Sequence, residues 1–304
     1  MSGDSFAELG LVLELLGAIE QLGYEEPTPV QRRTIPLLLA GRDVMVQAQT
    51  GSGKTAAFAL PAVQLLQPDL PTVQALVVAP TRELAVQVAE ATHRLGRGRG
   101  VAVCPVYGGQ PIERQLRALR AGAQVVVGTP GRLLDHLRRG SLALDAVRLL
   151  VLDEADEMLD MGFIEDIEEI IRSAPAERQT ALFSATLPAN IRRLAQQYMR
   201  DPELVAITPE RLTVAQTNQR YVEVSPRTKL DALSRILDHE APSASIVFCR
   251  TRREVDDLGE ALVSRGYAAE AIHGDLSQTQ RDRVMARFRS RQADVLVATD
   301  VAAR

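Results

Sequence analysis

The sequence predicts an α/β protein of two domains, each with a parallel β-sheet flanked by helices. Short apolar runs alternate with longer amphipathic stretches along most of the chain, a pattern typical of parallel strands joined by helices. The alternation is interrupted over residues 201–217, where two prolines and mixed polar residues occur, and then resumes. The 304 residues are enough for about two domains. We therefore expect a first domain over residues 1–207, a linker over 208–217 and a partial second domain over 218–304.

The bulk composition is that of an ordinary globular protein without a general attraction to nucleic acid. Hydrophobic residues make up 46% of the sequence, charged residues 24%, and the net charge is −4. Any binding to nucleic acid must therefore come from a few well-placed residues. Only 4% of the residues are aromatic and none is Trp, which disfavours a base-stacking surface and favours contact with the nucleic-acid backbone.

The sequence carries no sign of export or membrane insertion. No apolar run approaches the length of a membrane span, and residues 1–10 lack the basic and apolar regions of a signal peptide. Cys104 and Cys249 are far apart in the chain and outside any metal-like cluster, so we expect both to be buried and reduced. These observations predict a cytoplasmic protein without membrane contact, and we expect it to be a monomer.

Residues 6–31 are predicted to form a helix, a proline-stiffened turn and the start of a second helix. Apolar residues recur at helical spacing from Phe6 to Leu22, and Gly23 ends that helix. A glutamine amide such as that of Gln31 presents a donor and an acceptor side by side, the pattern that matches the N6 and N7 edge of adenine. Taken alone, Gln31 is more simply a surface residue of a helix, and its significance depends on the motifs that follow.

The stretch Ala48–Thr55, with the sequence AQTGSGKT, is predicted to bind phosphate. It follows an apolar run over residues 43–47 and precedes an apolar helical stretch over 56–66, which is the context that a phosphate-binding loop requires. Its glycines allow backbone N–H groups to turn toward phosphate oxygens, and the helix directs its positive end to the same place. Lys54 would supply a charge for the terminal phosphates and Thr55 a hydroxyl for Mg²⁺.

Five further strands are expected in the first half, and each ends in a compact polar motif. Ligands bind at the carboxyl ends of strands in such sheets, and the first three motifs offer hydroxyls, glycine N–H groups and arginines, which hold phosphodiester oxygens. Each motif alone is also consistent with a turn and a helix cap, but three on one sheet edge favour a binding surface. The strands are expected over residues 74–79, 101–106, 123–127, 148–152 and 179–183, and the three motifs are PTRELA (80–85), GG (108–109) and TPGR (129–132).

The fourth and fifth strand ends carry acidic and hydroxyl residues. Asp153 follows an aliphatic run near the phosphate loop, the position from which Mg²⁺ is held, and Glu154 could orient or deprotonate the attacking water. The fifth strand ends in Ser184 and Thr186, whose hydroxyls could bond to Asp153 or Asp156 and respond to the terminal phosphate. This hypothesis predicts energetic coupling between Thr186 and Asp156.

Taken together, these motifs resemble those of the DEAD-box ATP-dependent RNA helicases of superfamily 2, and they stand in that family's order along essentially the whole chain. The run DEAD at 153–156 names the family. Ala48, which departs from the general phosphate-loop pattern, is similar to the residue that this family carries there. The resemblance implies two RecA-like P-loop domains, the second incomplete in this sequence, with ATP and Mg²⁺ as cofactors and RNA as the partner.

The resemblance also implies roles for individual residues. Gln31 would read adenine, with Tyr24 and Phe6 packed around the base. The catalytic residues would be Lys54, Asp153 and Glu154, and the Mg²⁺ ligands Thr55 and Asp153. The residues implied to bind nucleotide are Gln49, Thr50, Gly51, Ser52, Gly53, Lys54 and Thr55. The residues implied to contact RNA are Thr81, Arg82, Gly109, Thr129 and Arg132. The residues implied to couple the two domains are Ser184, Thr186 and Asp156.

The second half repeats the alternation without a phosphate loop of its own and resembles the second RecA-like domain of the same family. By that resemblance, Arg250, Gly274 and Thr299 would contact RNA and Asp300 would approach the ATP ribose, while His273 is left unassigned. The expected elements are strands over residues 218–224, 245–248, 268–272 and 294–298 and helices over 228–238, 254–265 and 278–287.

The sequence stops at Arg304, inside the motif that begins at Ala298. The family places an arginine-rich motif after it, and such arginines are worth about 10³ to 10⁵ in rate in other phosphoryl-transfer systems. We therefore expect a fragment of a longer helicase that binds nucleotide through its first half and hydrolyses ATP weakly or not at all.

The resemblance implies a helicase that binds ATP and RNA across the cleft between its domains and bends the RNA strand. It would thereby separate short duplexes or remodel RNA–protein complexes. Two alternatives remain open, a DNA-directed helicase and a nucleotide-gated RNA clamp or assembly factor without processive unwinding. Gln31 and the DEAD run favour the RNA helicase over the first alternative, and Lys54 with Glu154 favours hydrolysis over the second.

Overall fold

The computed structural model describes residues 5–207, 218 and 220–299. The chain divides into two compact units, with the boundary between Glu210 and Arg211, and each unit is described by itself. The linker expected over residues 208–217 lies outside the described residues.

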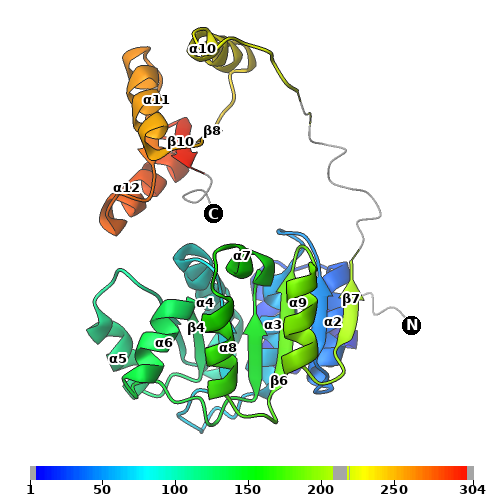
Figure 1. Ribbon diagram of the computed structural model, residues 1–304. Coiled ribbons are helices and arrows are strands. Elements are labelled where there is room, and N and C mark those ends of the chain that lie inside the picture. The colour runs from blue at the N-terminus through cyan, green and yellow to red at the C-terminus, as the bar shows by residue number, and fades with distance from the viewer. Residues whose placement is uncertain (1–4, 208–217, 219, 300–304) are drawn as a thin grey trace. The chain divides into compact units, whose positions relative to one another are not determined.

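A seven-stranded parallel sheet forms the centre of the first unit (Figure 1). The strand order is β3-β4-β2-β5-β6-β1-β7, so β1 lies between β6 and β7 and places Val46 opposite Phe183 and Val205. The predicted α/β fold with parallel strands is confirmed. The strands are β1 (Val44–Gln47), β2 (Ala75–Val78), β3 (Val103–Val106), β4 (Val125–Gly128), β5 (Leu149–Leu152), β6 (Gln179–Ser184) and β7 (Glu203–Ala206).

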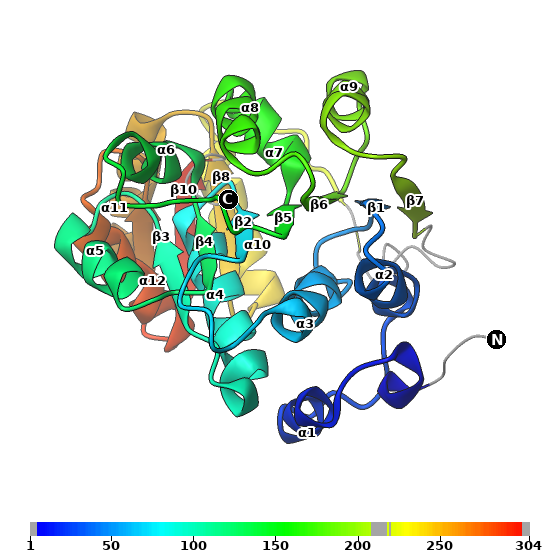
Figure 2. The ribbon, with the colours of Figure 1, turned by 90° about the horizontal axis from the view of Figure 1, so that it is seen from below.

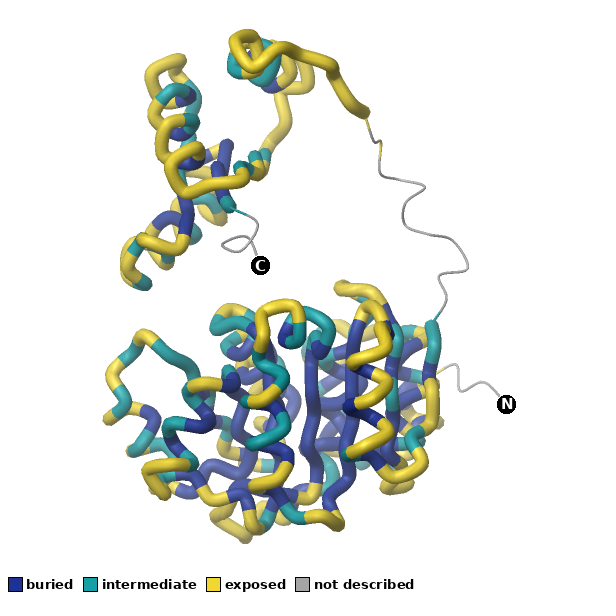
Figure 3. The backbone as a smooth tube through the Cα atoms, in the orientation of Figure 1, coloured by how far each residue is buried: buried dark blue, intermediate teal, exposed yellow. Residues whose placement is uncertain are grey.

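Helices cover both faces of this sheet (Figures 1 and 2). Because side chains alternate along a strand, Val77 of β2 packs in the core formed with α1–α4, whereas its neighbours Leu76 and Val78 pack in the core formed with α6–α9. Figure 3 shows the buried sheet between exposed helix surfaces. The helices are η1 (Phe6–Leu9), α1 (Leu13–Gln21), α2 (Pro29–Leu39), α3 (Lys54–Leu65), α4 (Arg82–Gly96), η2 (Arg97–Arg99), α5 (Ile112–Arg120), α6 (Pro130–Arg138), α7 (Ala155–Asp160), α8 (Ile164–Ser173) and α9 (Ala189–Tyr198).

Two expectations for the first unit are wrong. The single helix predicted from Phe6 to Leu22 is a 3₁₀ turn and a separate helix, because Gly10 adopts a left-handed conformation (φ 80°) that a continuous helix does not permit. The interruption of the alternation expected over residues 201–217 is wrong for residues 203–206, because these form β7, which adds to the edge of β1. Its four residues are too few to show a clear alternation, and two of them are exposed.

The second unit contains a three-stranded parallel sheet in the order β8-β10-β9, with helices packed on both of its faces. The strand predicted over residues 218–224 is wrong for its described part, since residues 218 and 220–224 hold no strand. The elements are α10 (Lys229–Glu240), β8 (Ser245–Cys249), α11 (Arg252–Ser264), β9 (Ala269–Ile272), α12 (Gln278–Arg289) and β10 (Val295–Thr299). In the described ranges of both units, no helix has the length and apolar character that crossing a membrane requires.

A buried carboxylate ties together the amino-terminal ends of three strands in the first unit. Asp43 is 3% exposed and precedes β1. Its Oδ1 accepts a hydrogen bond from Thr180 N (2.8 Å) and its Oδ2 accepts one from Arg200 N (2.7 Å). Its own carbonyl oxygen accepts from Glu203 N at 2.8 Å. This side chain therefore joins β1 to β6 and to the chain that enters β7.

We expect Asp43→Asn to lower the free energy of unfolding by about 1–3 kcal/mol, because an amide NH₂ would replace one of two oxygens that each accept from a backbone N–H. Urea unfolding followed by circular dichroism measures the change. The matched control is Asp145→Asn, an exposed residue of the same unit, which should change the unfolding free energy by less than about 0.5 kcal/mol. Equal effects of the two substitutions would contradict this assignment.

Candidate active site

The phosphate loop lies between the end of β1 and the start of α3. Ala48 N donates to Ser184 O (3.0 Å) and so continues the ladder between β1 and β6 up to the loop. Gly51 and Gly53 adopt left-handed conformations, with φ of 82° and 92°. A Cβ atom at Gly53 would lie 2.5 Å from Nε2 of Gln31, so this position also requires glycine for space.

Lys54 is the first residue of α3 and is buried, with 7% of its surface exposed. Its Nζ has no hydrogen-bond partner among the described residues, and the same is true of the buried Oγ of Ser52. Buried polar atoms are normally paired, so two unpaired ones beside a glycine-rich loop indicate a ligand with oxygen acceptors. A phosphate group has the charge and the acceptors that fit both atoms.

Asp153 follows β5 directly and is 2% exposed. Its N–H donates to Val78 O (2.9 Å), and its Oδ1 accepts from Glu154 N at 3.1 Å. Burial raises the pKa of Asp153 from its ordinary value of 3.8 to about 7, although the nearby positive charge of Lys54 opposes the increase. The carboxylate is therefore held in a position where its ionised form is costly without a further positive partner.

Glu154 has the left-handed conformation, φ 50° and ψ 52°, at the residue that precedes α7. This conformation is uncommon for a residue with a side chain and costs about 1 kcal/mol or more. Burial raises the pKa of the half-buried Glu154 carboxyl, again against the charge of Lys54. Backbone strain and a raised pKa both occur often at catalytic positions.

Asp156 is hydrogen-bonded to the two hydroxyl residues at the end of β6. Its Oδ2 accepts from Thr186 Oγ1 (2.8 Å) and from Thr186 N (2.9 Å), and Asp156 N donates to Ser184 Oγ at 3.3 Å. Burial alone would raise the pKa of Asp156, but the hydrogen bonds from Thr186 and Ser184 outweigh burial and lower it. The pairing expected with either Asp153 or Asp156 is therefore observed with Asp156.

A cavity of about 540 Å³ opens beside these groups. Tyr24 and Gln31 line it on the side of α2, and the ring of Tyr24 stacks on the buried ring of Phe6 at a centroid distance of 6.4 Å. The remaining lining residues are Glu26, Thr28, Thr50, Gly51, Gly53, Lys54, Thr55, Ala56, Leu84, Gln87, Ala91, Asp153 and Glu154. Among the residues predicted to bind nucleotide, Gln49 and Ser52 do not line the cavity, and Phe6 supports it only from behind Tyr24.

Gln31 is 4% exposed and its amide is already bonded to the protein. Its Oε1 accepts from Thr28 N (3.0 Å) and its Nε2 donates to Gly53 O at 3.1 Å. The side chain thus connects the proline-stiffened turn to the phosphate loop, and its role toward adenine stays a prediction. Sequence reasoning missed Leu84, Gln87 and Ala91 of α4, whose ordinary helical pattern carries no signal of a pocket wall.

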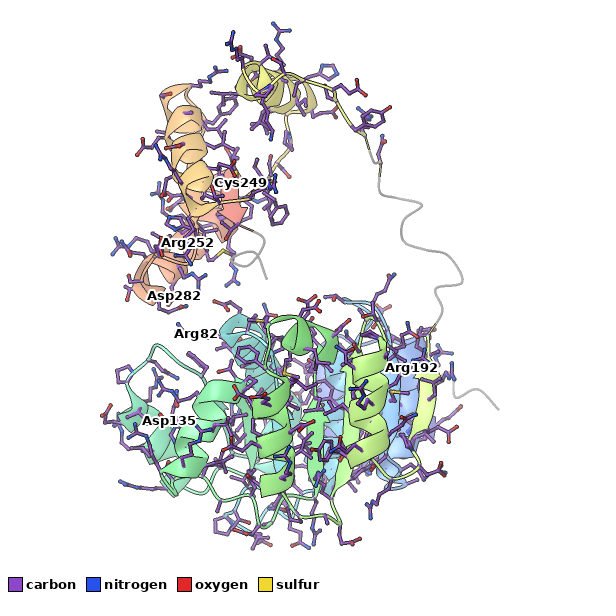
Figure 4. The ribbon with its side chains drawn as sticks, viewed as in Figure 1. Arg82, Asp135, Arg192, Cys249, Arg252 and Asp282 are labelled. Atoms are coloured by element: carbon purple, nitrogen blue, oxygen red, sulfur yellow. The ribbon has the colours of Figure 1, made fainter. Side chains whose placement is uncertain are left out.

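The residues predicted to contact RNA in the first unit lie at the carboxyl ends of β2, β3 and β4. Thr81 caps α4, with its Oγ1 accepting from Leu84 N (3.2 Å). The guanidinium of Arg82 packs against Gly109, where a Cβ atom would lie 1.9 Å from Nη2, and its Nη1 is buried without a partner among the described residues. Figure 4 shows Arg82 at this edge of the unit. Thr129 N donates to Val106 O (3.0 Å), and Arg132 follows in the first turn of α6.

In the second unit, the predicted contact residues lie around the carboxyl ends of β8, β9 and β10. Arg250 N donates to Glu254 Oε2 at 3.1 Å, and Thr299 ends β10. Gly274 lies against the guanidinium of Arg252, which is labelled in Figure 4, and this guanidinium forms an ion pair with Asp275. Asp300, predicted to approach the ATP ribose, lies outside the described residues.

The phosphate loop on a parallel sheet, the buried lysine and the acidic strand end define a P-loop protein of the RecA-like class. Comparison with known proteins identifies the family. The profile of the DEAD/DEAH box helicases matches residues 28–194, and that of the helicase conserved C-terminal domain matches residues 228–304. The chain belongs to the DEAD-box family of helicases.

Named relatives and solved structures agree with this assignment. The chain is 57% identical to the DEAD-box ATP-dependent RNA helicase CshA of Geobacillus kaustophilus and 52% identical to that of Bacillus subtilis, over 99% of its own length in both. It spans 64% and 61% of the length of these two proteins, less than two thirds of either.

Among solved structures, the chain resembles Saccharomyces cerevisiae Dbp5 bound to RNA and ADP BeF3, with 33% identity and a TM-score of 0.89 over 99% of this chain and 77% of the other. A DEAD box protein from the hyperthermophile Methanococcus jannaschii is 41% identical, with a TM-score of 0.67 over 100% of this chain and 82% of the other.

We expect Asp153→Asn to stabilise the ligand-free protein at pH 8. The pKa of Asp153 is near 7 in the folded protein and 3.8 in the unfolded chain. Above about pH 7, Asp153 is ionised in both states, and the full cost of burying its charge lowers the free energy of unfolding. The penalty falls as the pH drops from 7 toward 3.8, because the folded carboxyl then takes up a proton that the unfolded one does not. The expected gain is on the order of 2 kcal/mol at pH 8.

Urea unfolding of both proteins between pH 4 and pH 8 measures this difference. The gain of Asp153→Asn should shrink steadily with acidification, whereas the control Asp160→Asn, an exposed position, should show no such trend. If Asp153→Asn raised the free energy of unfolding by the same amount at every pH in this range, the conclusion that Asp153 is buried and ionised at pH 8 would be wrong.

Proposed function

We propose that the protein is an ATP-dependent RNA helicase whose first unit binds ATP in the cavity beside the phosphate loop. The observation that carries this proposal is the buried, unpaired Nζ of Lys54, which lies in the same cavity wall as the carboxyls of Asp153 and Glu154. Membership of the DEAD-box family and the names of the relatives, which are ATP-dependent RNA helicases, support it.

Each residue of the cavity then has a part in phosphoryl transfer. Lys54 and the backbone N–H groups of Gly51 and Gly53 bind the phosphates, and Tyr24 with Gln31 borders the position of the base. Glu154 orients the attacking water and accepts its proton, for which a raised pKa is favourable. Its left-handed backbone at the start of α7 brings Glu154 into the wall of the cavity.

The hydroxyl of Thr55 and the carboxylate of Asp153 are the groups that would hold Mg²⁺. Both are hard oxygen donors, and no group of three or more His, Cys, Asp or Glu side chains suited to a metal ion occurs in the described ranges. This donor set fits Mg²⁺, which keeps several waters and takes further oxygens from substrate phosphates. When bound, the ion neutralises charge that develops on the phosphates.

RNA is proposed to bind through its sugar–phosphate backbone to residues of each unit, namely Thr81, Arg82, Gly109, Thr129 and Arg132 in the first and Arg250, Gly274 and Thr299 in the second. These groups are hydroxyls, glycines and guanidiniums, which bind phosphates and riboses but carry little base specificity. The strand would be bent by this grip, so that short duplexes separate or bound proteins are displaced. The alternative is a clamp that binds RNA under the control of ATP without separating strands. ATP-dependent RNA binding in the absence of unwinding would favour this alternative.

We expect Lys54→Ala to weaken binding of a fluorescent ATP analogue in the presence of Mg²⁺ by about tenfold or more, because a charge-assisted contact to phosphate is lost. Glu154→Gln should bind the analogue nearly as well as the parent protein, while RNA-stimulated hydrolysis falls by about 10² or more. The matched control is Lys229→Ala in the second unit. Analogue binding that is unchanged by Lys54→Ala would overturn the proposed site.

The bond between Thr186 and Asp156 is proposed to couple the phosphate site to RNA binding. We expect Thr186→Val and Asp156→Ala to be non-additive in RNA-stimulated ATP hydrolysis, with a coupling energy of about 1 kcal/mol, because each removes the hydrogen bond between Thr186 Oγ1 and Asp156 Oδ2. Thr186→Val combined with Asp160→Ala is the control pair, since Asp160 is exposed. Simple additivity in both pairs would rule out the coupling role.

A further inference from the structure

A buried polar link joins the loop after β3 to helix α6 in the first unit. Gln115 of α5 is 2% exposed and His136 of α6 is fully buried. Gln115 Nε2 donates to Tyr107 O (2.8 Å), and Gln115 Oε1 lies 2.9 Å from His136 Nε2. On the other side of the ring, His136 Nδ1 lies 2.8 Å from Oγ of Ser141, which follows the end of α6. The residue before His136, Asp135, marks this helix in Figure 4.

The hydrogen-bond partners determine where the protons of this link lie. Since the amide nitrogen of Gln115 faces the carbonyl oxygen of Tyr107, its oxygen must face His136, and Nε2 of the imidazole therefore carries the hydrogen. Nδ1 of the neutral ring then accepts from the hydroxyl of Ser141, which also lies 3.1 Å from the carbonyl oxygen of His136. Burial and the nearby charge of Arg132 both lower the pKa of His136 and so favour the neutral ring.

Both ends of the link lie next to residues that are proposed to bind RNA. Tyr107 immediately precedes the pair Gly108 and Gly109, and His136 lies one turn after Arg132 on α6. The guanidinium of Arg82 packs against Gly109. The glycine pair is thus attached to Gln115 through the carbonyl of Tyr107 and is also in contact with the Arg82 guanidinium.

An apolar pair would hold α5 against α6 as well as this polar one does. Burying an amide and an imidazole gains little net stability, and each group must be fully paired to avoid a penalty. A hydrogen-bonded pair, however, fixes the position and orientation of the loop backbone, because the Gln115 amide bonds to one particular carbonyl oxygen, that of Tyr107. The feature therefore suits the positioning of a backbone segment.

We propose that Gln115 and His136 are positioning residues that hold the Gly108–Gly109 backbone at a fixed distance from the start of α6, so that one RNA strand is bound by both loops at once. The inference rests on the proposed function, because it assigns these two loops to a common RNA path. Neither side chain contacts RNA, since both are buried. Their effect is to preorganise the RNA-binding edge in the ligand-free protein.

Two substitutions of His136 separate the two halves of the link. In His136→Asn, the amide oxygen takes the place of Nδ1 and keeps the bond from Ser141, but the side chain is too short to reach Gln115. In His136→Gln, the amide nitrogen takes the place of Nε2 and keeps the bond to Gln115, whereas the bond to Ser141 is lost. Both variants replace the neutral ring with a neutral amide, so they form a matched pair.

We expect His136→Asn to weaken binding of a single-stranded oligonucleotide RNA, in the presence of a non-hydrolysable ATP analogue, by about three- to tenfold. His136→Gln and Ser141→Ala should stay within about twofold of the parent protein. Affinity for the ATP analogue should be unchanged in all three. Gln115→Met, which removes the link at nearly constant volume, should match His136→Asn, and combining the two should add no further loss.

Amide hydrogen exchange of residues 107–110 in the ligand-free protein tests the positioning without RNA. Exchange should be faster in His136→Asn than in His136→Gln, while the urea midpoints of the two variants remain similar. Equal exchange rates and equal RNA affinities in the two variants would overturn the inference. A parent protein that does not bind RNA, with exchange still different between the variants, would overturn the proposed function and leave the link as a device that positions the loop for another ligand.

Discussion

Every feature of the candidate site depends on the constraint that parallel strands place their carboxyl ends at one edge of the sheet. Lys54 follows β1, Asp153 follows β5 and Ser184 ends β6, yet about 130 residues separate the first from the last. The ladder between β1 and β6 continues past Gln47 to Ala48 and so fixes the phosphate loop against the end of β6. The hydroxyl that contacts Asp156 and the lysine that faces Asp153 are in this way parts of one rigid edge.

This edge contains several interactions that a stable protein would avoid. A lysine is buried without a partner, a carboxylate is buried beside it, and Glu154 adopts a left-handed backbone. Two apolar cores, one on each face of the sheet, stabilise the fold and offset the unfavourable energy of these features. A ligand that carries phosphate oxygens and a divalent cation would pair with both the buried lysine and the buried carboxylate. This pairing explains why the two unfavourable charges lie in the wall of one cavity.

Much of the fold and of the candidate site followed from the sequence because the signals are local. The strand ends were predictable from short aliphatic runs such as Leu149–Leu152, and the loop from its glycines and lysine. The misses have long-range causes. β7 forms by pairing with β1, which lies 156 or more residues earlier in the chain. Gln87 lines the cavity because α4 packs beside α3. The link between Gln115 and His136 was equally invisible, because neither residue stands out from the helix that carries it.

The place at which the chain leaves the first unit has a mechanical consequence. Ala206 is aligned with Gln47, Ile207 N donates to Gln47 O (2.9 Å), and Arg33 Nη1 donates to Ala206 O (2.8 Å). The exit strand therefore runs beside the strand that supports the phosphate loop and ends level with it. Tension applied along the chain beyond this point would load the ladder between β7 and β1 in shear, so that its hydrogen bonds resist together instead of opening one by one. The phosphate loop thus lies beside the end of β7 at which such a load would enter the first unit.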